Sequence, residues 1–189
     1  MIRPARAEDA EQIREISLEL TVARNSGQQG FVEYQTPPID EMRKRIQLGI
    51  FYVSEGDRVA GFVSAFTDQH LDQLNFEGDE IVKHLKTRPR PFIYVDELGV
   101  KKNHQNKGTG YWLMRRMIAE NAKTPLLGAI SHAPIRNEKA IAVCLSLGSK
   151  LEEEITIYDG LTFGIYRLTA YSAHTLQQDT YRAFLGQTK

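Results

Sequence analysis

The sequence predicts a single domain of the α/β class. Runs rich in β-branched and aromatic residues alternate with runs whose apolar residues recur at helical spacing. Two short turn signals each join neighbouring strand-like runs into an antiparallel hairpin. A chain of 189 residues is long enough to bury one core. We therefore expect residues 1–168 to form the domain and residues 169–189 a C-terminal tail, helical around Leu176–Leu185, within the same domain.

The N-terminal half is expected to contain a short edge strand, two helices and a hairpin. The first helix carries acidic residues in its first turn, where the helix dipole favours them. The second ends at Gly49 and places Met42, Ile46 and Leu48 inward. A tight turn at residues 55–57 joins the hairpin strands. The expected bounds are Ile2–Ala5, Ala7–Leu20, Pro37–Leu48, Ile50–Ser54 and Arg58–Phe66.

The C-terminal half begins with a polar insertion that spans Gln69–Pro91. A strand, a central helix, a second strand, another helix and a closing hairpin follow. The last helix should bury one face, and the Asp159–Gly160 pair is a two-residue hairpin signal. That buried face is expected to be formed by Ala140, Ile141, Cys144 and Leu145. The expected bounds are Asp79–Lys86, Phe92–Val100, Gly108–Ala122, Leu126–Ser131, Asn137–Leu147, Leu151–Tyr158 and Leu161–Leu168.

Composition excludes several classes of function. Lys plus Arg and Asp plus Glu are both 24, so the basic excess typical of duplex-binding proteins is absent and no nucleic-acid partner is expected. The single cysteine and the histidine spacing predict no metal site. The first residues lack the apolar core of a signal peptide, and no apolar run approaches the roughly 20 residues that span a bilayer. The expected location is the cytoplasm.

The segment Tyr94–Arg115 has the composition of an anion site, because a strand leads through a short polar loop into a helix. The loop ends in Gly108-Thr-Gly110, and amides at a helix start have no intrahelical acceptor. Glycines let the backbone approach a phosphate without an intervening Cβ. The loop is not a P-loop, and Leu113 occupies the third glycine position of a Rossmann fingerprint. Basic side chains bracket it: Lys101, Lys102, Lys107, Arg115 and Arg116.

The run Gln105-Asn-Lys-Gly108-Thr-Gly110 matches Gln/Arg-x-x-Gly-x-Gly/Ala and thereby resembles the pyrophosphate-binding signature of the GNAT superfamily of acyl-CoA-dependent N-acyltransferases. Leu98–Val100 resembles the bulged strand of that superfamily, and Asn137–Gly148 its second motif. The resemblance covers about residues 1–168. It implies the GNAT fold, a mixed, largely antiparallel seven-stranded sheet with helices on both faces, whose motif strand diverges from Leu126–Ser131.

The resemblance also implies a binding site for acetyl-CoA as cosubstrate. The pyrophosphate would lie on the glycine loop, and the pantetheine amides would pair with the preceding strand. Asn137 would contact CoA or order a water near the reaction centre, although a helix cap is an equally good reading. The implied CoA-binding residues are Leu98, Gly99, Val100, Gln105, Asn106, Lys107, Gly108, Thr109, Gly110, Tyr111 and Asn137.

Asp96 and Glu97 are the candidate general bases, because an ammonium substrate must lose a proton before it attacks a thioester. Adjacent residues of a strand face opposite sides, so only one of them should see the cleft. Glu97 is favoured, and relatives often place a catalytic carboxylate at one of these positions. The competing interpretation for each residue is a solvated or salt-bridged carboxylate.

The general acid departs from the family pattern. Family members often protonate the leaving thiolate with a tyrosine of the second motif, and that position is Cys144 here. A helical cysteine is usually a small core side chain. The alternatives for the general acid are Tyr158, Tyr166 and Ser146, or a reaction without a general acid. His132, a lone loop histidine, is assigned no role.

The expected function is acetyl transfer from acetyl-CoA to a primary amine of a small molecule or peptide. The loop Gln28–Gln35 with Glu33 and Tyr34, and the acidic segment Asp68–Glu80, are expected to flank the acceptor. Two rivals stay open at this point: a GNAT-like acyl-CoA-binding or regulatory module without turnover, and a domain that binds another nucleotide. A monomer and a homodimer are both compatible with the sequence.

Overall fold

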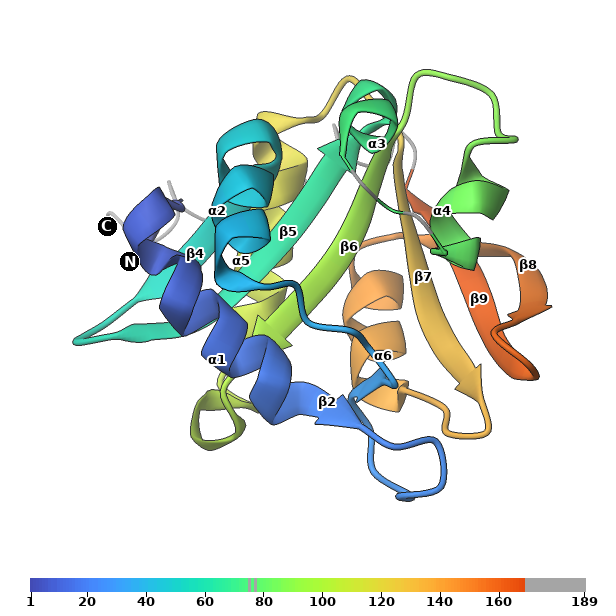
Figure 1. Ribbon diagram of the computed structural model, residues 1–189, viewed down its shortest axis with the longest axis horizontal. Coiled ribbons are helices and arrows are strands. Elements are labelled where there is room, and N and C mark those ends of the chain that lie inside the picture. Colours follow the sequence, from blue (N-terminus) through green and yellow to red (C-terminus); the bar gives the residue numbers. More distant parts are fainter. Residues whose placement is uncertain (75, 77, 169–189) are drawn as a thin grey trace, which may run out of the picture.

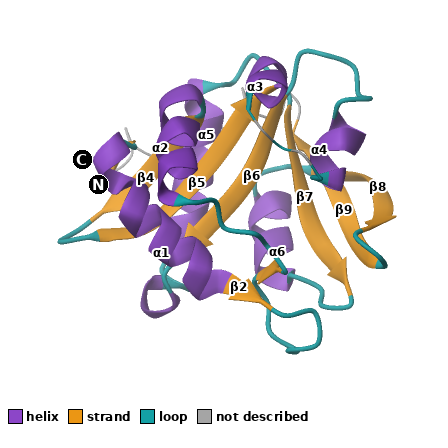
Figure 2. Cartoon of the chain, in the orientation of Figure 1, coloured by secondary structure: helices purple, strands orange, loops and turns teal. Residues whose placement is uncertain are grey.

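A computed structural model describes residues 1–74, 76 and 78–168, and its centre is one seven-stranded sheet (Figure 2). Only β6 and β7 pair in parallel, and the other neighbours are antiparallel. The mixed, largely antiparallel sheet is therefore confirmed. Across the sheet the strands are β1 (Ile2–Pro4), β4 (Ile50–Glu55), β5 (Val59–Thr67), β6 (Ile93–Val100), β7 (Leu126–Ala133), β9 (Leu161–Leu168) and β8 (Lys150–Ile157).

Helices cover both faces of the sheet (Figure 1). The first face carries α1 (Ala10–Leu20) and α2 (Ile39–Leu48), and the second carries α5 (Thr109–Glu120) and α6 (Glu138–Ser146). Residues of β7 at positions 126 and 130 share a face, which places α5 and α6 on the same side. The remaining short elements are η1 (Ala7–Asp9), β2 (Thr21–Val22), β3 (Phe31–Val32), α3 (Asp68–Gln73), α4 (Glu80–Leu85) and η2 (Lys102–His104).

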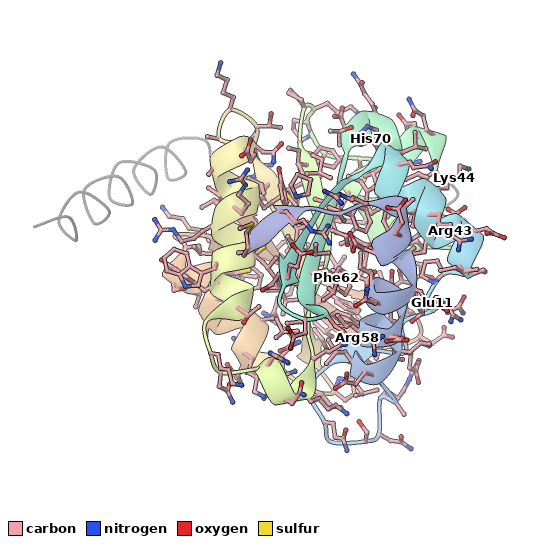
Figure 3. All side chains as sticks on the ribbon, turned by 90° about the vertical axis from the view of Figure 1, so that its left-hand side faces the viewer. Glu11, Arg43, Lys44, Arg58, Phe62 and His70 are labelled. Carbon is pink, nitrogen blue, oxygen red and sulfur yellow. The ribbon has the colours of Figure 1, made fainter. Side chains whose placement is uncertain are left out.

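The core is divided by β5, which is buried along nearly its whole length. Phe62 and Phe66 point to the α1 and α2 side, whereas Val63 and Ala65 point to α5. Figure 3 shows Phe62 between the two helical layers, with charged side chains such as Glu11 at the surface. Alternating residues thus bury both faces, which explains why β5 is an almost unbroken apolar run.

Some local expectations are wrong. Leu48 and Leu145 are 36% and 53% exposed, because the apolar face of each helix is narrower than the periodicity indicates. The hairpin of β8 and β9 turns over three residues, since Ile157 pairs with Leu161 and positions 158–160 all have positive φ. Helix α3 and the parallel pair β2–β3 were not predicted. The helix expected at 176–185 lies outside the described residues.

The pairing of β6 with β7 is short, and this shapes the site. Only residues 93–95 of β6 pair with residues 126–128 of β7. From Asp96 onward no pairing with β7 is formed by the described part of β6, while pairing with β5 continues to Val100. The expected divergence of these two strands is thereby confirmed, and a gap opens at the centre of the sheet.

Candidate active site

A cavity of about 920 Å³ passes through the gap between β6 and β7 and is lined from both faces of the sheet. Its walls differ chemically. On the α1 and α2 side the main polar lining residues are Tyr34, Arg45, Asp79, Asp96 and Tyr158. On the α5 and α6 side the lining includes Leu98, Met114, Ile130, Cys144 and Tyr166. Two reactants entering from opposite faces can therefore meet inside the sheet.

The glycine loop forms the start of α5, as predicted. Gly108 is the N-cap residue and has a left-handed backbone with φ +78°, and Asn106 also has a positive φ of 60°. The first-turn amides, beginning at Thr109, have no intrahelical acceptors and carry the positive end of the helix dipole. A Cβ on Gly110 would only make ordinary contact with Leu98, at 3.6 Å. The conformational need for glycine is therefore at Gly108.

Gln105 connects this loop to two other elements. Its side-chain amide donates to the Val100 carbonyl at 3.0 Å, which ties the loop to the end of β6. The Nζ of Lys139, on α6, donates to Gln105 Oε1 at 3.1 Å. Lys139 therefore adds a cation beside the loop from a segment 34 residues away. No local sequence pattern indicates a role for Lys139, because only the tertiary structure brings α6 against the loop.

The other predicted residues of this region are distributed over the two faces. Leu98 lines the cavity, whereas Gly99 is buried on the opposite face, where a Cβ would meet Phe62 at 2.6 Å. The Nζ of Lys107 donates to the Asn103 carbonyl at 3.1 Å. Gly99 thus has a packing role that is sufficient to explain a glycine at this position.

A β-bulge at Asp96 brings both candidate carboxylates to one face. Ser64 pairs with Glu97 and Ala65 with Val95, so Asp96 is the extra residue of β6. An extra residue interrupts the alternation of side chains and re-aims them. The Tyr34 hydroxyl donates to Glu97 Oε1 at 2.8 Å and lies 3.5 Å from Asp96 Oδ2.

Two expectations are therefore wrong. Asp96 and Glu97 do not face opposite sides of the sheet, because the bulge falls between them and Val95. The bulge also does not lie at Leu98–Val100, a segment that stays in register with β5. The two adjacent carboxylates are the sequence signal that could have indicated the true position of the bulge. A regular buried strand would not place both of these side chains on the same side.

The two carboxyl groups have strongly perturbed pKa values. Glu97 is 3% exposed and accepts hydrogen bonds from Ser17 Oγ at 2.6 Å and from Tyr34. Burial, followed by the negative charge of Asp96, raises the pKa of Glu97 to about 8. Burial also raises the pKa of Asp96 to about 6, although the Arg45 guanidinium at 3.8 Å opposes the increase. Asp96 lines the cavity, and Glu97 lies behind it against α1.

The second motif contributes two residues to the cavity wall. Asn137 Oδ1 accepts the Ala140 amide at 3.2 Å and so caps α6, while the residue also lines the cavity. Cys144 packs with Ile130, Ile141 and Tyr166. Burial raises the pKa of its thiol to about 11, so the thiol stays protonated at neutral pH.

The acidic loops predicted to flank an acceptor reach the cavity only in part. Glu33, Tyr34 and Asp79 line it, together with Glu41 of α2. The Thr36 hydroxyl also belongs to this wall and is buried without a hydrogen-bond partner among the described residues.

The other acidic side chains of the predicted segment are engaged elsewhere. Asp72 pairs with Arg90 and Lys86, and Asp68 pairs with Arg90. Glu80 accepts the Tyr158 amide at 2.6 Å. Position 77 lies outside the described residues. The acidic character of the cavity therefore comes from fewer residues than the sequence indicates.

Within residues 1–74, 76 and 78–168, no group of three or more His, Cys, Asp or Glu side chains is arranged to hold a metal ion. Over the same residues, none of the helices has the length and apolar character needed to cross a membrane.

Comparison with known proteins identifies the family. No curated protein sequence matches the chain. Solved structures match at low identity. An N-acetyltransferase from Staphylococcus aureus Mu50 matches with 16% identity and a TM-score of 0.62, over 89% of this chain and 100% of that chain. The ribosomal-protein-S18-alanine N-acetyltransferase from Escherichia coli matches with 14% identity and a TM-score of 0.59, over 89% of this chain and 92% of that chain. Arabidopsis thaliana NAA60 in complex with acetyl-CoA also matches, with 12% identity and a TM-score of 0.60, over 89% of this chain and 98% of that chain. These likenesses show the fold. A family model described as the Acetyltransferase (GNAT) family matches residues 11–148, and because that is more than half of the chain, the chain belongs to this family.

Proposed function

We propose that this GNAT acetyltransferase transfers an acetyl group directly from acetyl-CoA to a primary amine, with the Asp96 and Glu97 pair as the proton acceptor. The observation that carries the proposal is the cavity through the sheet. The cavity connects the side of the sheet where α5 begins with a wall that contains buried carboxylates. A reaction between a phosphorylated donor and a cationic amine requires both of these environments. One family neighbour, Arabidopsis thaliana NAA60, was solved with acetyl-CoA.

The part of the site next to the start of α5 fits acetyl-CoA in its geometry and charge. The amides that begin α5 at Gly108–Tyr111, with Lys107 and Lys139 nearby, suit a pyrophosphate. The unpaired edge of β6 beyond Val95 offers backbone groups to the amides of an extended arm. One of these N–H groups is suited to polarise the thioester carbonyl.

The carboxylate pair suits proton removal near neutral pH. Primary amines are mostly protonated in water, because a lysine-type amine has a pKa of about 10.4 and an α-amine about 7.7–8.0. With pKa values of about 6 and about 8, Asp96 and Glu97 together hold about one proton at neutral pH. Asp96 lines the cavity and is therefore the member of the pair that is placed to receive the proton, while Glu97 lies behind it against α1. The proposal thus moves the base from Glu97 to Asp96.

The acceptor half of the cavity indicates a cationic ligand. Asp79, Glu33 and Glu41 line it beside Asp96. Glu33 is paired with Arg24, and Arg45 is paired with both Asp96 and Glu41, so Asp79 adds negative charge that the cations of these pairs do not balance. A small-molecule or peptide amine that enters from the α1 and α2 face would meet a net negative wall. Long-range attraction of this kind steers a cation towards the site.

The test has two steps. Calorimetric titration should show binding of CoA and none of ATP at the same concentration. A free-thiol release assay with acetyl-CoA against a diverse set of amines should then identify the acceptor class. Absence of CoA binding would refute the proposal.

A second candidate is a module that binds CoA without turnover. The observation that favours it is Cys144, at the position where family members often have a tyrosine that protonates the leaving thiolate. It predicts CoA binding with no thiol release for any amine, so the same assay separates the two functions.

A further inference from the structure

A chain of three side chains runs from the surface to the cavity on the α6 side of the sheet. The Glu154 carboxylate contacts His132 Nδ1, and His132 Nε2 lies 2.9 Å from the Tyr166 hydroxyl. Tyr166 is 3% exposed and lines the cavity, and His132 is 9% exposed. The Glu154 side chain is 52% exposed, so the outer end of the chain is in contact with solvent.

The backbone is adapted to hold His132 in this place. Ser131 pairs with Phe163 and Ala133 with Thr162, so His132 is an extra residue in β7, a second bulge. Opposite it, a Cβ on Gly164 would lie 2.5 Å from both His132 Cε1 and Nε2. Only glycine leaves room for the imidazole here. The contact between His132 and Tyr166 is therefore built into two strands.

Tyr166 lines the cavity on the side of the sheet opposite the carboxylate pair. It belongs to the buried cluster against which Cys144 packs, and Cys144 stands where the resemblance to the family implies a tyrosine that acts as general acid. Asp96 lies on the opposite face, and the cavity joins the two through the gap between β6 and β7. In a direct transfer the amine loses its proton on one side of the thioester and the sulfur gains one on the other.

The other substitutes are less suited. The Tyr158 hydroxyl donates to Asp79 at 2.7 Å and accepts the Ile81 amide at 3.3 Å, on the α4 side of the cavity. Ser146 is exposed and donates to the Val143 carbonyl. Cys144 carries a proton, but a thiol is a weak hydrogen-bond donor. Of the candidates, Tyr166 alone combines a place in the wall beside Cys144 with a histidine that can replace its proton.

We propose that Tyr166 is the general acid of this acetyltransferase and that His132 and Glu154 are positioning residues that restore its proton; the proposal rests on the proposed function. The C–S bond breaks, and its electron pair on sulfur takes the phenolic proton of Tyr166. The phenolate oxygen takes the Nε2 proton of a doubly protonated His132. Neutral His132 keeps its Nδ1 proton on Glu154, and Nε2 regains a proton through the Tyr166 hydroxyl from water that enters the cavity after the products leave.

The decisive variant is Tyr166→Phe, which keeps the ring and removes the hydroxyl. With the accepted amine, kcat should fall by at least about tenfold, within the usual range for loss of a general acid. The KM for acetyl-CoA and the Kd for CoA should change less than about twofold, because the phenol acts on the leaving sulfur only.

A second readout needs no acceptor. A phenol that donates to the sulfur stabilises the thiolate, so the thiol pKa of CoA bound to Tyr166→Phe should be higher than that of CoA bound to the wild type. The ultraviolet absorbance of the thiolate follows this titration, with the complex of desulfo-CoA as the blank that removes the protein's own tyrosines.

Matched variants separate this role from packing. Tyr52→Phe removes a hydroxyl on β4 from a residue that does not line the cavity, and it should change neither readout. His132→Gln can still donate to Tyr166 but cannot relay a proton, so it should lower kcat and leave CoA affinity intact. Glu154→Gln, which preserves an acceptor for Nδ1, should restore more of the rate than Glu154→Leu.

Each outcome bears on the proposal. If Tyr166→Phe keeps both kcat and the thiol pKa of bound CoA, Tyr166 is not the acid. If Cys144→Ala produces both changes instead, the thiol is the donor and the proposal is wrong. Failure of the wild type to bind CoA would overturn the proposed function and this inference together, whereas CoA binding with an unchanged thiol pKa overturns this inference alone.

Discussion

At the scale of single residues, the proposed proton acceptors Asp96 and Glu97 form a buried pair. Tyr34 and Ser17 hold Glu97, and Arg45 lies beside Asp96. Two neighbouring buried carboxyl groups on the same face of a strand cannot both lose their protons without a large free-energy cost. The pair therefore titrates as a unit, and its apparent pKa values belong to both residues.

Asp96→Asn should abolish most turnover, while Glu97→Gln should simplify the pH dependence of turnover. Loss of the proton acceptor is expected to lower kcat/KM by about a hundredfold or more. Gln resembles the protonated form of Glu97, so in Glu97→Gln the rising limb of kcat/KM against pH, near pH 6 for Asp96, should stay in place, and any change near pH 8, where Glu97 ionises, should disappear. The measurement is kcat/KM across the pH range. Asp72→Asn, in a surface ion pair, is the matched control, and an unchanged rate for Asp96→Asn would exclude Asp96 as the base.

The same pair should make stability depend on pH. The folded pKa of Glu97, about 8, lies above its ordinary value of 4.5, so the folded state binds the proton more tightly. This contribution is fully present below about pH 4.5 and is lost as pH rises through about 8. Glu97→Gln removes it. The free energy of unfolding in urea should therefore fall less for Glu97→Gln than for wild type between about pH 5 and pH 8. An equal fall in both proteins would contradict the assigned shift.

At the scale of elements, the start of α5 depends on one left-handed residue. Gly108→Ala places a Cβ at φ +78°, which costs about 1–2 kcal/mol in this conformation. Relief of that strain would reorient the N-cap and the first amides, so the Kd for CoA should rise by about tenfold in calorimetric titration.

The control for this prediction is Gly27→Ala. Gly27 has φ +69° and open space around its Cβ position, so the substitution carries a similar backbone cost away from the loop. Both variants should lower the free energy of unfolding, but only Gly108→Ala should weaken CoA binding. Equal Kd values for the two would show that the conformation of Gly108 has no role in CoA binding.

At the scale of the whole molecule, a cavity that crosses the sheet favours direct transfer. Donor and acceptor can occupy opposite sides at once, so no acetyl-enzyme is required. The one cysteine, Cys144, has a thiol pKa of about 11 and is therefore a poor nucleophile at neutral pH. Initial-rate plots should intersect as for a sequential mechanism. Intact mass measurement after incubation with acetyl-CoA alone should show no stable acetyl adduct, and an adduct on Cys144 would refute direct transfer.

Much of this architecture could be predicted from the sequence. The hairpin of β4 and β5 and the start of α5 are each encoded within a few residues, by turn chemistry and by a glycine at the N-cap. The predicted positions of Leu48 and Leu145 were wrong because periodicity reports which helix face is apolar and not how wide the buried contact is.

The sequence by itself determined the family, the order of the main elements and the glycine loop at the start of α5, because these depend on short-range spacing and on backbone conformations that few residues adopt. Tertiary structure decided the rest of the site. The bulge at Asp96 placed two carboxylates on one face, the fold of α6 brought Lys139 to Gln105, and the bulge at His132 joined it to Tyr166. These are contacts between residues 30 or more positions apart, or shifts in strand register, and a local pattern specifies neither.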